Sequence, residues 1–136
     1  MHALQPLITQ GTGSTDLYLI LGDPVEQVRA PESFNRLFAH FGIDAVLVPV
    51  QVAPQDLNAF VKTAFLAKNI KGMWVTIPHK TSIVDVLDDS TPLAHVAGAV
   101  NAVRRTAGGR TEGALFDGEG FVASLDYYAI AYAGKR

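Results

Sequence analysis

The stretch "WVTIPHK", residues 74–80, sets the pattern for the whole chain. Its first four residues are apolar or β-branched and predict the end of a buried strand. Pro78 ends that strand because proline has no N–H to donate to a ladder. His79 and Lys80 follow at once, so a strand end delivers a lysine to the edge of the predicted sheet. A lysine held there against apolar walls is partly desolvated, which favours loss of its proton and suits proton transfer.

Strand-like runs alternate with helical patterns on both sides of this stretch. Strands are predicted over 17–21, 45–50, 70–77, 99–105 and 111–116, and helices over 31–41, 54–69, 80–89, 91–98 and 118–132. Gly108 and Gly109 mark a hairpin between the last two strands. The alternation predicts an α/β fold: an open, mostly parallel sheet with helices on both faces and an antiparallel hairpin near the edge.

Size and composition indicate one domain. The chain has 136 residues, of which 49% are hydrophobic, enough for a single core. We expect residues 1–16 to be an irregular lead-in and residues 17–136 to form the domain. The absence of cysteine excludes disulfides and thiolate metal sites, and no two of the four histidines stand at ligand spacing, so we expect no metal.

Charge and hydropathy exclude two classes of partner. The net charge of −2 and the scattered cations argue against nucleic acid. No signal peptide or membrane-spanning run is present in the sequence, so we expect a cytoplasmic protein that does not bind a membrane. A small molecule is the expected ligand, and the sequence leaves a homodimer open.

The carboxyl ends of the predicted strands point to a site. Ligands of open α/β sheets bind in the crevice at these ends, where four loops meet. The segment "FDGEG", residues 116–120, brings Asp117 to the same edge as Lys80. Together the two side chains would form an acid–base pair. Taken singly, Lys80 would be an exposed surface lysine and Asp117 a helix N-cap.

Four segments then carry a family resemblance. They are "LGDPVEQVRAPESFN" (21–35), "GMWVTIPHK" (72–80), "GAVNAV" (98–103) and "GALFDGEGF" (113–121). In this order and spacing they resemble the amino-terminal, substrate-binding half of shikimate dehydrogenases and their quinate/shikimate relatives. The resemblance implies an oxidoreductase of the shikimate pathway, and so of aromatic amino acid biosynthesis. Such an enzyme transfers a hydride between a nicotinamide cofactor and a hydroxyl or keto group of a small cyclic, shikimate-like acid.

The resemblance also assigns roles. It implies that Lys80 and Asp117 are the catalytic pair and that Thr76 and Asn101 bind the substrate and line its pocket. It places NADP or NAD on a second domain, and this chain has no strand followed by G-x-G-x-x-G. Because the sequence stops where the family's cofactor domain would begin, we expect it to be a piece of a longer enzyme.

The sequence departs from the family at four polar positions. Val28 and Ala30 stand where two serines usually bind the substrate carboxylate. Trp74 and Leu115 stand where asparagines are usual. Sites that lose polar partners reject the ligand that those partners bind, so we expect an altered, less polar substrate. The same losses favour an alternative, a non-catalytic small-molecule binding module that keeps the fold.

Three further residues have two interpretations each. Arg29 lies between Val28 and Ala30 and could clamp a carboxylate at two points, or it could be an exposed loop arginine. Trp74 could stack on a substrate ring or pack in the core. His79 could contact a ligand, although a bond to the backbone is favoured.

Overall fold

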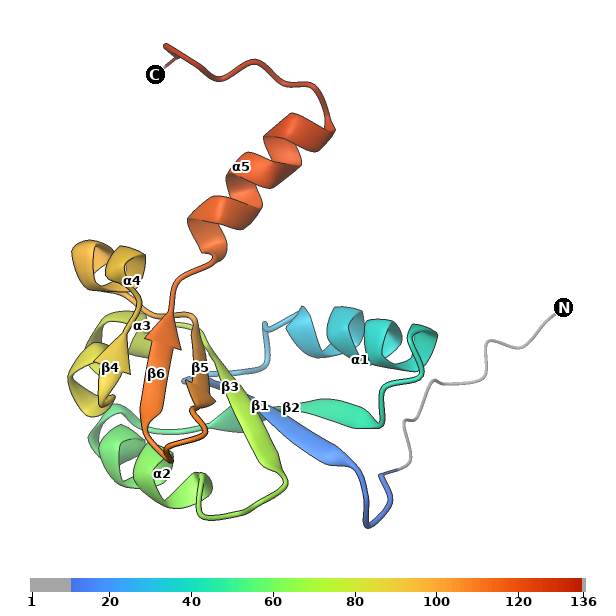
Figure 1. Ribbon diagram of the computed structural model, residues 1–136, viewed down its shortest axis with the longest axis vertical. Coiled ribbons are helices and arrows are strands. Elements are labelled where there is room, and N and C mark those ends of the chain that lie inside the picture. Colours follow the sequence, from blue (N-terminus) through green and yellow to red (C-terminus); the bar gives the residue numbers. More distant parts are fainter. Residues whose placement is uncertain (1–10, 136) are drawn as a thin grey trace, which may run out of the picture.

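A computed structural model describes residues 11–135 of the chain. They form a six-stranded mixed sheet with the strand order β2-β1-β3-β5-β6-β4 (Figure 1). The strands are β1 (Asp16–Gly22), β2 (Ala45–Gln51), β3 (Ile70–Val75), β4 (Asp89–Ser90), β5 (Ala102–Arg105) and β6 (Thr111–Ala114). The α-helices are α1 (Ala30–His40), α2 (Leu57–Ala64), α3 (His79–Ser82), α4 (Pro92–Ala97) and α5 (Asp117–Tyr127), with 3₁₀ turns η1 (Pro54–Asp56) and η2 (Ile83–Val86).

The strand directions bring distant segments to one edge. β1 runs parallel to β2 and β3, β4 runs parallel to β6, and β5 is antiparallel to both β3 and β6. The carboxyl ends of β1, β3 and β6 therefore meet the amino end of β5 at the same edge. The predicted mostly parallel sheet and its β5–β6 hairpin are confirmed. β4, which the sequence did not predict, lies outside the hairpin and forms the edge strand.

The main core lies on one face of the sheet, under α2, α3, η2 and α4. Alternate strand residues point into it, because successive side chains of a strand face opposite sides. These are Leu19, Leu21, Met73, Val75 and Val103, which pack with Leu57, Val61, Phe65, Ile83, Ala94 and Val100. Each of these side chains is almost completely removed from water, so this face carries most of the hydrophobic stabilisation.

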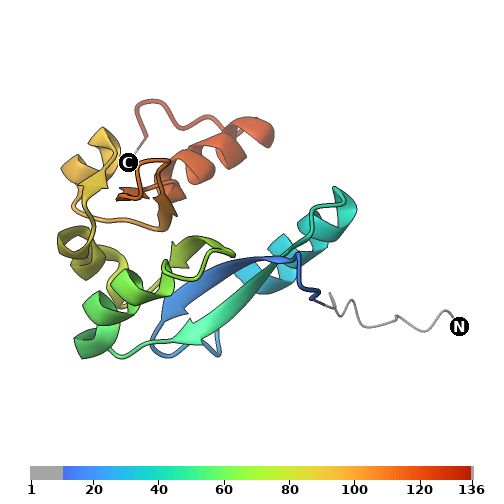
Figure 2. The ribbon, with the colours of Figure 1, turned by 60° about the horizontal axis from the view of Figure 1, so that its bottom comes forward.

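The opposite face of β1 and β3 is covered by α1 and an aromatic cluster, defined here as Tyr18, Phe34, Phe38 and Trp74. The ring centres of Trp74 lie 4.8 Å from Phe34 and 5.3 Å from Tyr18, both edge-on, and Phe38 stacks on Tyr18 at 5.6 Å. Figure 2 shows α1 and α2 on different sides of β1 and β2. Helices on both faces, as predicted, are thus present. Trp74 packs against Tyr18 and Phe34, which agrees with the packing interpretation of this residue.

Two predicted helices are shorter than expected. The helix predicted over 54–69 begins as η1 and ends at Ala64. Phe65 must turn into the core, and the Asn69 carbonyl already accepts a hydrogen bond of 2.7 Å from the Leu17 N–H at the sheet. The last helix ends at Tyr127 rather than near 132, and it extends away from the sheet (Figure 1).

The segment predicted as a helix over 80–89 is wrong in its second half. After α3 and η2, the Asp88 carboxylate accepts hydrogen bonds from the Thr111 N–H at 2.8 Å and the Thr111 hydroxyl at 3.0 Å. These bonds hold the chain beside β6, where β4 pairs with it. The following helix α4 has the predicted Thr91 cap, whose hydroxyl accepts from the Ala94 N–H at 3.4 Å.

The lead-in predicted over 1–16 lies partly outside the described residues. Of the described part, Thr15 is buried and β1 already begins at Asp16. The Asp44 carboxylate accepts hydrogen bonds from the hydroxyls of Ser14 and Thr15, both at 2.7 Å, and these bonds lower the pKa of Asp44. This turn is therefore tied to the fold. Among residues 11–135, no helix is long and apolar enough to cross a membrane.

Gly113 in β6 offers a test of the packing. A Cβ at this position would lie 2.6 Å from side-chain atoms of Leu87 and Val100, both well inside contact distance. We expect Gly113→Ala to lower the free energy of unfolding by about 1–3 kcal/mol, as overpacking does. Gly120→Ala in α5, where nothing lies within 4 Å, is the control and should be neutral or stabilising. Urea unfolding measures both, and equal effects would contradict the packing argument.

Candidate active site

Lys80 and Asp117 are in direct contact at the carboxyl edge of the sheet. Lys80 lies in α3, directly after the β3 strand end, and Asp117 is the first residue of α5, after β6. The Lys80 Nζ donates a hydrogen bond of 2.5 Å to Asp117 Oδ2. Both side chains remain open to solvent, with 33% and 54% of their surface exposed. The structure therefore brings together the two residues that the sequence predicted as a catalytic pair, and that role stays a prediction.

Asn101 fixes the carboxylate of this pair. Its side-chain N–H donates to Asp117 Oδ1 at 2.8 Å, while its side-chain oxygen accepts from the Phe116 N–H at 2.9 Å. Its backbone joins two strands, accepting from the Val75 N–H at 2.8 Å and donating to the Ala114 carbonyl at 2.9 Å. One residue thus ties the ends of β3 and β6 together and sets the direction of Asp117.

The contacts of Asp117 keep it ionised. The hydrogen bond from Lys80 lowers the pKa of Asp117 and is the largest effect on it. Partial burial raises this pKa by less, and the hydrogen bond from Asn101 lowers it further. The carboxylate is therefore an acceptor on both oxygens at neutral pH. Because Asp117 has lost its proton, Lys80 is the member of the pair that can donate one.

The backbone below Lys80 is held rigidly. His79 is completely buried, and its Nε2 is hydrogen-bonded to the Val52 carbonyl at 2.7 Å. The Lys80 carbonyl accepts from the Val100 N–H at 2.8 Å. Nδ1 of His79 has no partner in the described part of the chain. The interpretation of His79 as bonded to backbone is confirmed, but the acceptor lies 27 residues away and no sequence signal pointed to it.

Thr76 lies between two loops that pass close together. Its N–H donates to the Leu21 carbonyl at 2.9 Å. A Cβ on Gly22 would lie 2.7 Å from Thr76 Cγ2 and 3.1 Å from the Ile77 carbonyl oxygen, so only glycine permits this approach. The close approach holds the half-buried Thr76 at the same edge as the pair. Its predicted role in substrate binding stays a prediction.

Arg29 is paired with an acid of its own helix. Its guanidinium contacts Glu32 Oε1 at 3.2 Å, and 83% of its side chain is exposed. The structure therefore matches the exposed-arginine interpretation, and the carboxylate clamp stays untested. Glu32 was not singled out from the sequence, although its spacing three residues after Arg29 is the usual one for a helical ion pair. Val28 and Ala30 flank Arg29 and are half-buried.

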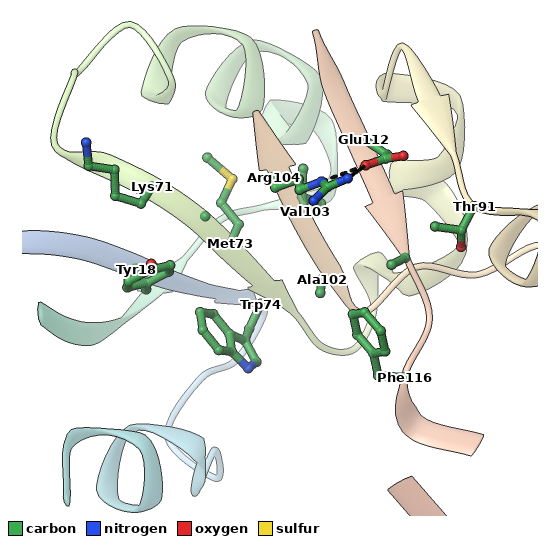
Figure 3. A pocket seen from close by; sticks show the side chains of 12 residues that line it. Tyr18, Lys71, Met73, Trp74, Thr91, Ala102, Val103, Arg104, Glu112 and Phe116 are labelled. Atoms are coloured by element: carbon green, nitrogen blue, oxygen red, sulfur yellow. Dashed lines mark hydrogen bonds and ion pairs between the residues drawn. The ribbon is translucent and has the colours of Figure 1, made fainter. Parts of the chain in front are cut away.

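A groove of about 400 Å³ lies beside this site, on the sheet face that α1 leaves open. Figure 3 shows it over β3, β5 and β6, between Trp74 and Phe116, with the Arg104–Glu112 ion pair at its other end. Trp74 lines this groove rather than touching Lys80 or Asp117. The groove is lined mainly by apolar groups, and the charges of Arg104 and Glu112 are paired with each other. We therefore place the chemistry at the Lys80–Asp117 pair.

The described residues do not form a cradle for a dinucleotide phosphate. A helix N-terminus that binds phosphate must leave its N–H groups and positive end free. Besides the four-residue α3, which carries Lys80, two helices begin at this edge. They carry their own acids in the first turn, Glu32 in α1 and Asp117 and Glu119 in α5. No group of three or more histidine, aspartate or glutamate side chains is placed to hold a metal ion within residues 11–135.

The fold and this pair define an α/β domain that presents a lysine–carboxylate pair at the carboxyl ends of its strands. Residues 20–103 match the sequence model of the shikimate dehydrogenase substrate binding domain. The NADP-dependent shikimate dehydrogenase of Geobacter metallireducens is 41% identical over 126 residues, which are 92% of this chain and 43% of that protein. The chain belongs to the family of shikimate dehydrogenase substrate-binding domains.

Solved structures agree with this family. The chain is similar to shikimate 5-dehydrogenase of Listeria monocytogenes in complex with shikimate and NAD, with a TM-score of 0.83 and 32% identity over 90% of this chain and 42% of that one. It is also similar to 5-ketofructose reductase of a Gluconobacter strain, with a TM-score of 0.80 and 29% identity over 85% and 41% of the two chains. The chain spans about two fifths of the length of the curated relatives that it matches.

The pKa of Asp117 predicts an effect of acid on stability. Because that pKa is lower in the folded than in the unfolded chain, ionised Asp117 stabilises the fold above the unfolded value of about 3.9. This contribution is lost as the pH falls through the folded value. Asp117→Asn should therefore flatten the loss of stability below about pH 4, measured by urea unfolding at successive pH values. Glu119→Gln in the same turn is the control; an identical flattening there would contradict the assignment.

Proposed function

We propose that this chain is the substrate-binding domain of a dehydrogenase that uses NADP or NAD. The reaction interconverts a hydroxyl and a keto group on a small cyclic, shikimate-like acid, with a substrate specificity altered from that of the family. The observation that carries the proposal is the hydrogen bond from Lys80 to Asp117, fixed by Asn101, in a chain of this family. The nicotinamide, held by residues outside those described here, supplies or accepts the hydride.

The residues of this chain would handle the proton. When a carbonyl is reduced, its carbon gains a hydride and its oxygen takes a proton from the Lys80 ammonium group, giving an alcohol. In the opposite direction the hydroxyl proton leaves to the neutral Lys80 amine while the carbon loses a hydride. Asp117 holds the amine in place through Oδ2. Asn101 and Thr76 would orient the substrate oxygens at the same edge.

The alternative is a small-molecule binding module without catalysis. The apolar residues Val28, Ala30, Trp74 and Leu115 in place of polar ones support it. It predicts saturable binding of a ligand at this edge, with no turnover by the intact protein. A cytoplasmic location and a homodimer stay predictions.

Lys80→Met in the intact protein that contains this chain tests the proposal. We expect kcat to fall by about 10²–10⁴-fold, because a positioned proton donor contributes that much, while KM changes little. Lys68→Met is the matched control, since Lys68 is exposed and precedes β3 at the opposite edge of the sheet. Nicotinamide absorbance measures the rates, and circular dichroism shows that both variants fold. Unchanged turnover in Lys80→Met would remove this residue from the mechanism.

A further inference from the structure

We propose that His79 is a positioning residue for Lys80 and acts through its buried hydrogen bond to the loop after β2. The inference rests on the proposed function, in which Lys80 transfers the proton, and it adds a residue to that mechanism. Because the His79 side chain is completely buried, it acts on the lysine that follows it in the chain and not on the substrate.

His79 connects the lysine to segments that are distant in the sequence. Its Nε2 is hydrogen-bonded at 2.7 Å to the carbonyl oxygen of Val52, 27 residues earlier. The Val52 N–H donates in turn to the Gly22 carbonyl at 3.0 Å, and the His79 N–H donates to the Thr76 carbonyl at 2.9 Å. The ends of β1, β2 and β3 are therefore joined to the residue next to Lys80.

The helix that carries Lys80 is too short to hold its own position. α3 contains four residues, His79–Ser82, and so short a helix has little stability without outside contacts. Two such contacts fall on neighbouring residues: the His79 side chain bonds to the Val52 carbonyl, and the Lys80 carbonyl accepts from the Val100 N–H at 2.8 Å. Together they fix the backbone from which the Lys80 side chain extends.

The same part of the chain fixes the partner of Lys80. Asn101, directly after Val100, donates to the Asp117 carboxylate at 2.8 Å. Lys80 and Asp117 are thus both anchored on residues 100–101, and the His79 bond adds the anchor on the loop after β2. Of the two contacts that hold the α3 backbone, the His79 bond is the one that a side-chain substitution can remove.

The acceptor defines what His79 has to supply. A carbonyl oxygen can only accept, so Nε2 carries the ring proton and donates it to Val52. Nδ1 has no hydrogen-bond partner in the described part of the chain. A side chain that offers one N–H at the reach of Nε2 should therefore preserve the contact, and a shorter one should not.

Loss of this contact should reduce the rate more than it reduces binding. Proton transfer requires the two heavy atoms to lie within about 2.6–3.2 Å, and a misplacement of about 1 Å can slow a reaction by about 10²-fold. The Lys80 Nζ reaches Asp117 at 2.5 Å, so a shift of α3 would change the direction of this amine. Substrate contacts made by other residues would stay in place.

Two amide variants of the intact protein test the inference. The amide of His79→Gln reaches about as far as Nε2, and that of His79→Asn, the matched control, reaches only as far as Nδ1. We expect His79→Asn to lower kcat by about 10–100-fold with KM nearly unchanged, and His79→Gln to stay within about threefold of the original kcat. Equal kcat values in the two variants would overturn the inference, and so would a change confined to KM.

A double-mutant cycle separates positioning of Lys80 from a general loss of structure. If His79 acts through Lys80, His79→Asn should lower kcat by less than about twofold when Lys80 is already methionine. Losses that multiply in the double variant would contradict positioning. Unchanged turnover in Lys80→Met alone would instead refute the proposed function, whatever the two amide variants do.

Circular dichroism and thermal unfolding show whether each variant folds. If His79→Asn does not fold, His79→Leu takes its place, because it removes the donor without burying another unpaired polar side chain. The same fall in kcat and the same result in the cycle are expected for it. If neither variant folds, His79 is needed for the structure itself and the inference is overturned.

Discussion

The site depends on one residue that is hydrogen-bonded to two strands at once. Asn101 hydrogen-bonds through its backbone to β3 and β6, and through its side chain to Asp117 and the Phe116 N–H. It thereby links the ends of two strands whose following segments carry Lys80 and Asp117, which are 37 residues apart in the chain. An amide suits this place since it can donate and accept at the same time. An ionised carboxylate could only accept, and an aliphatic side chain could do neither.

Close packing under the loops provides the second constraint. A Cβ on Gly22 would lie 2.7 Å from Thr76, so the ends of β1 and β3 approach more closely than a larger residue permits. A Cβ on Gly113 in β6 would lie 2.6 Å from Leu87 and from Val100. His79 is buried beneath the loop and bonded to the Val52 carbonyl. These contacts fix the segments on either side of Lys80 at the carboxyl edge of the sheet.

The sequence predicted the element types well where a pattern is local. Proline and glycine positions and the apolar runs placed the strands and the hairpin, and the structure confirms these elements and the Thr91 cap. Three strands are shorter than predicted: β3 ends at Val75 instead of residue 77, β5 begins at Ala102 instead of residue 99, and β6 ends at Ala114 instead of residue 116. The predictions were wrong where contacts with residues distant in the sequence determine the secondary structure. The helix over 54–69 stops early because Phe65 is drawn into the core, and β4 exists because Asp88 bonds to Thr111 on another strand. Neither partner can be read from local spacing.

By itself, the sequence determined the fold class, the family and the presence of Lys80 and Asp117 at strand ends, because these follow from short-range patterns and specific motifs. It left open whether the two side chains meet, what Trp74 packs against and whether Arg29 is free. The tertiary structure decided these points: Lys80 contacts Asp117, Trp74 packs on Tyr18 and Phe34, and Arg29 is paired with Glu32. The physical reason is that contacts and ion pairs depend on distances between segments, which strand order and direction set and which composition and spacing leave undefined.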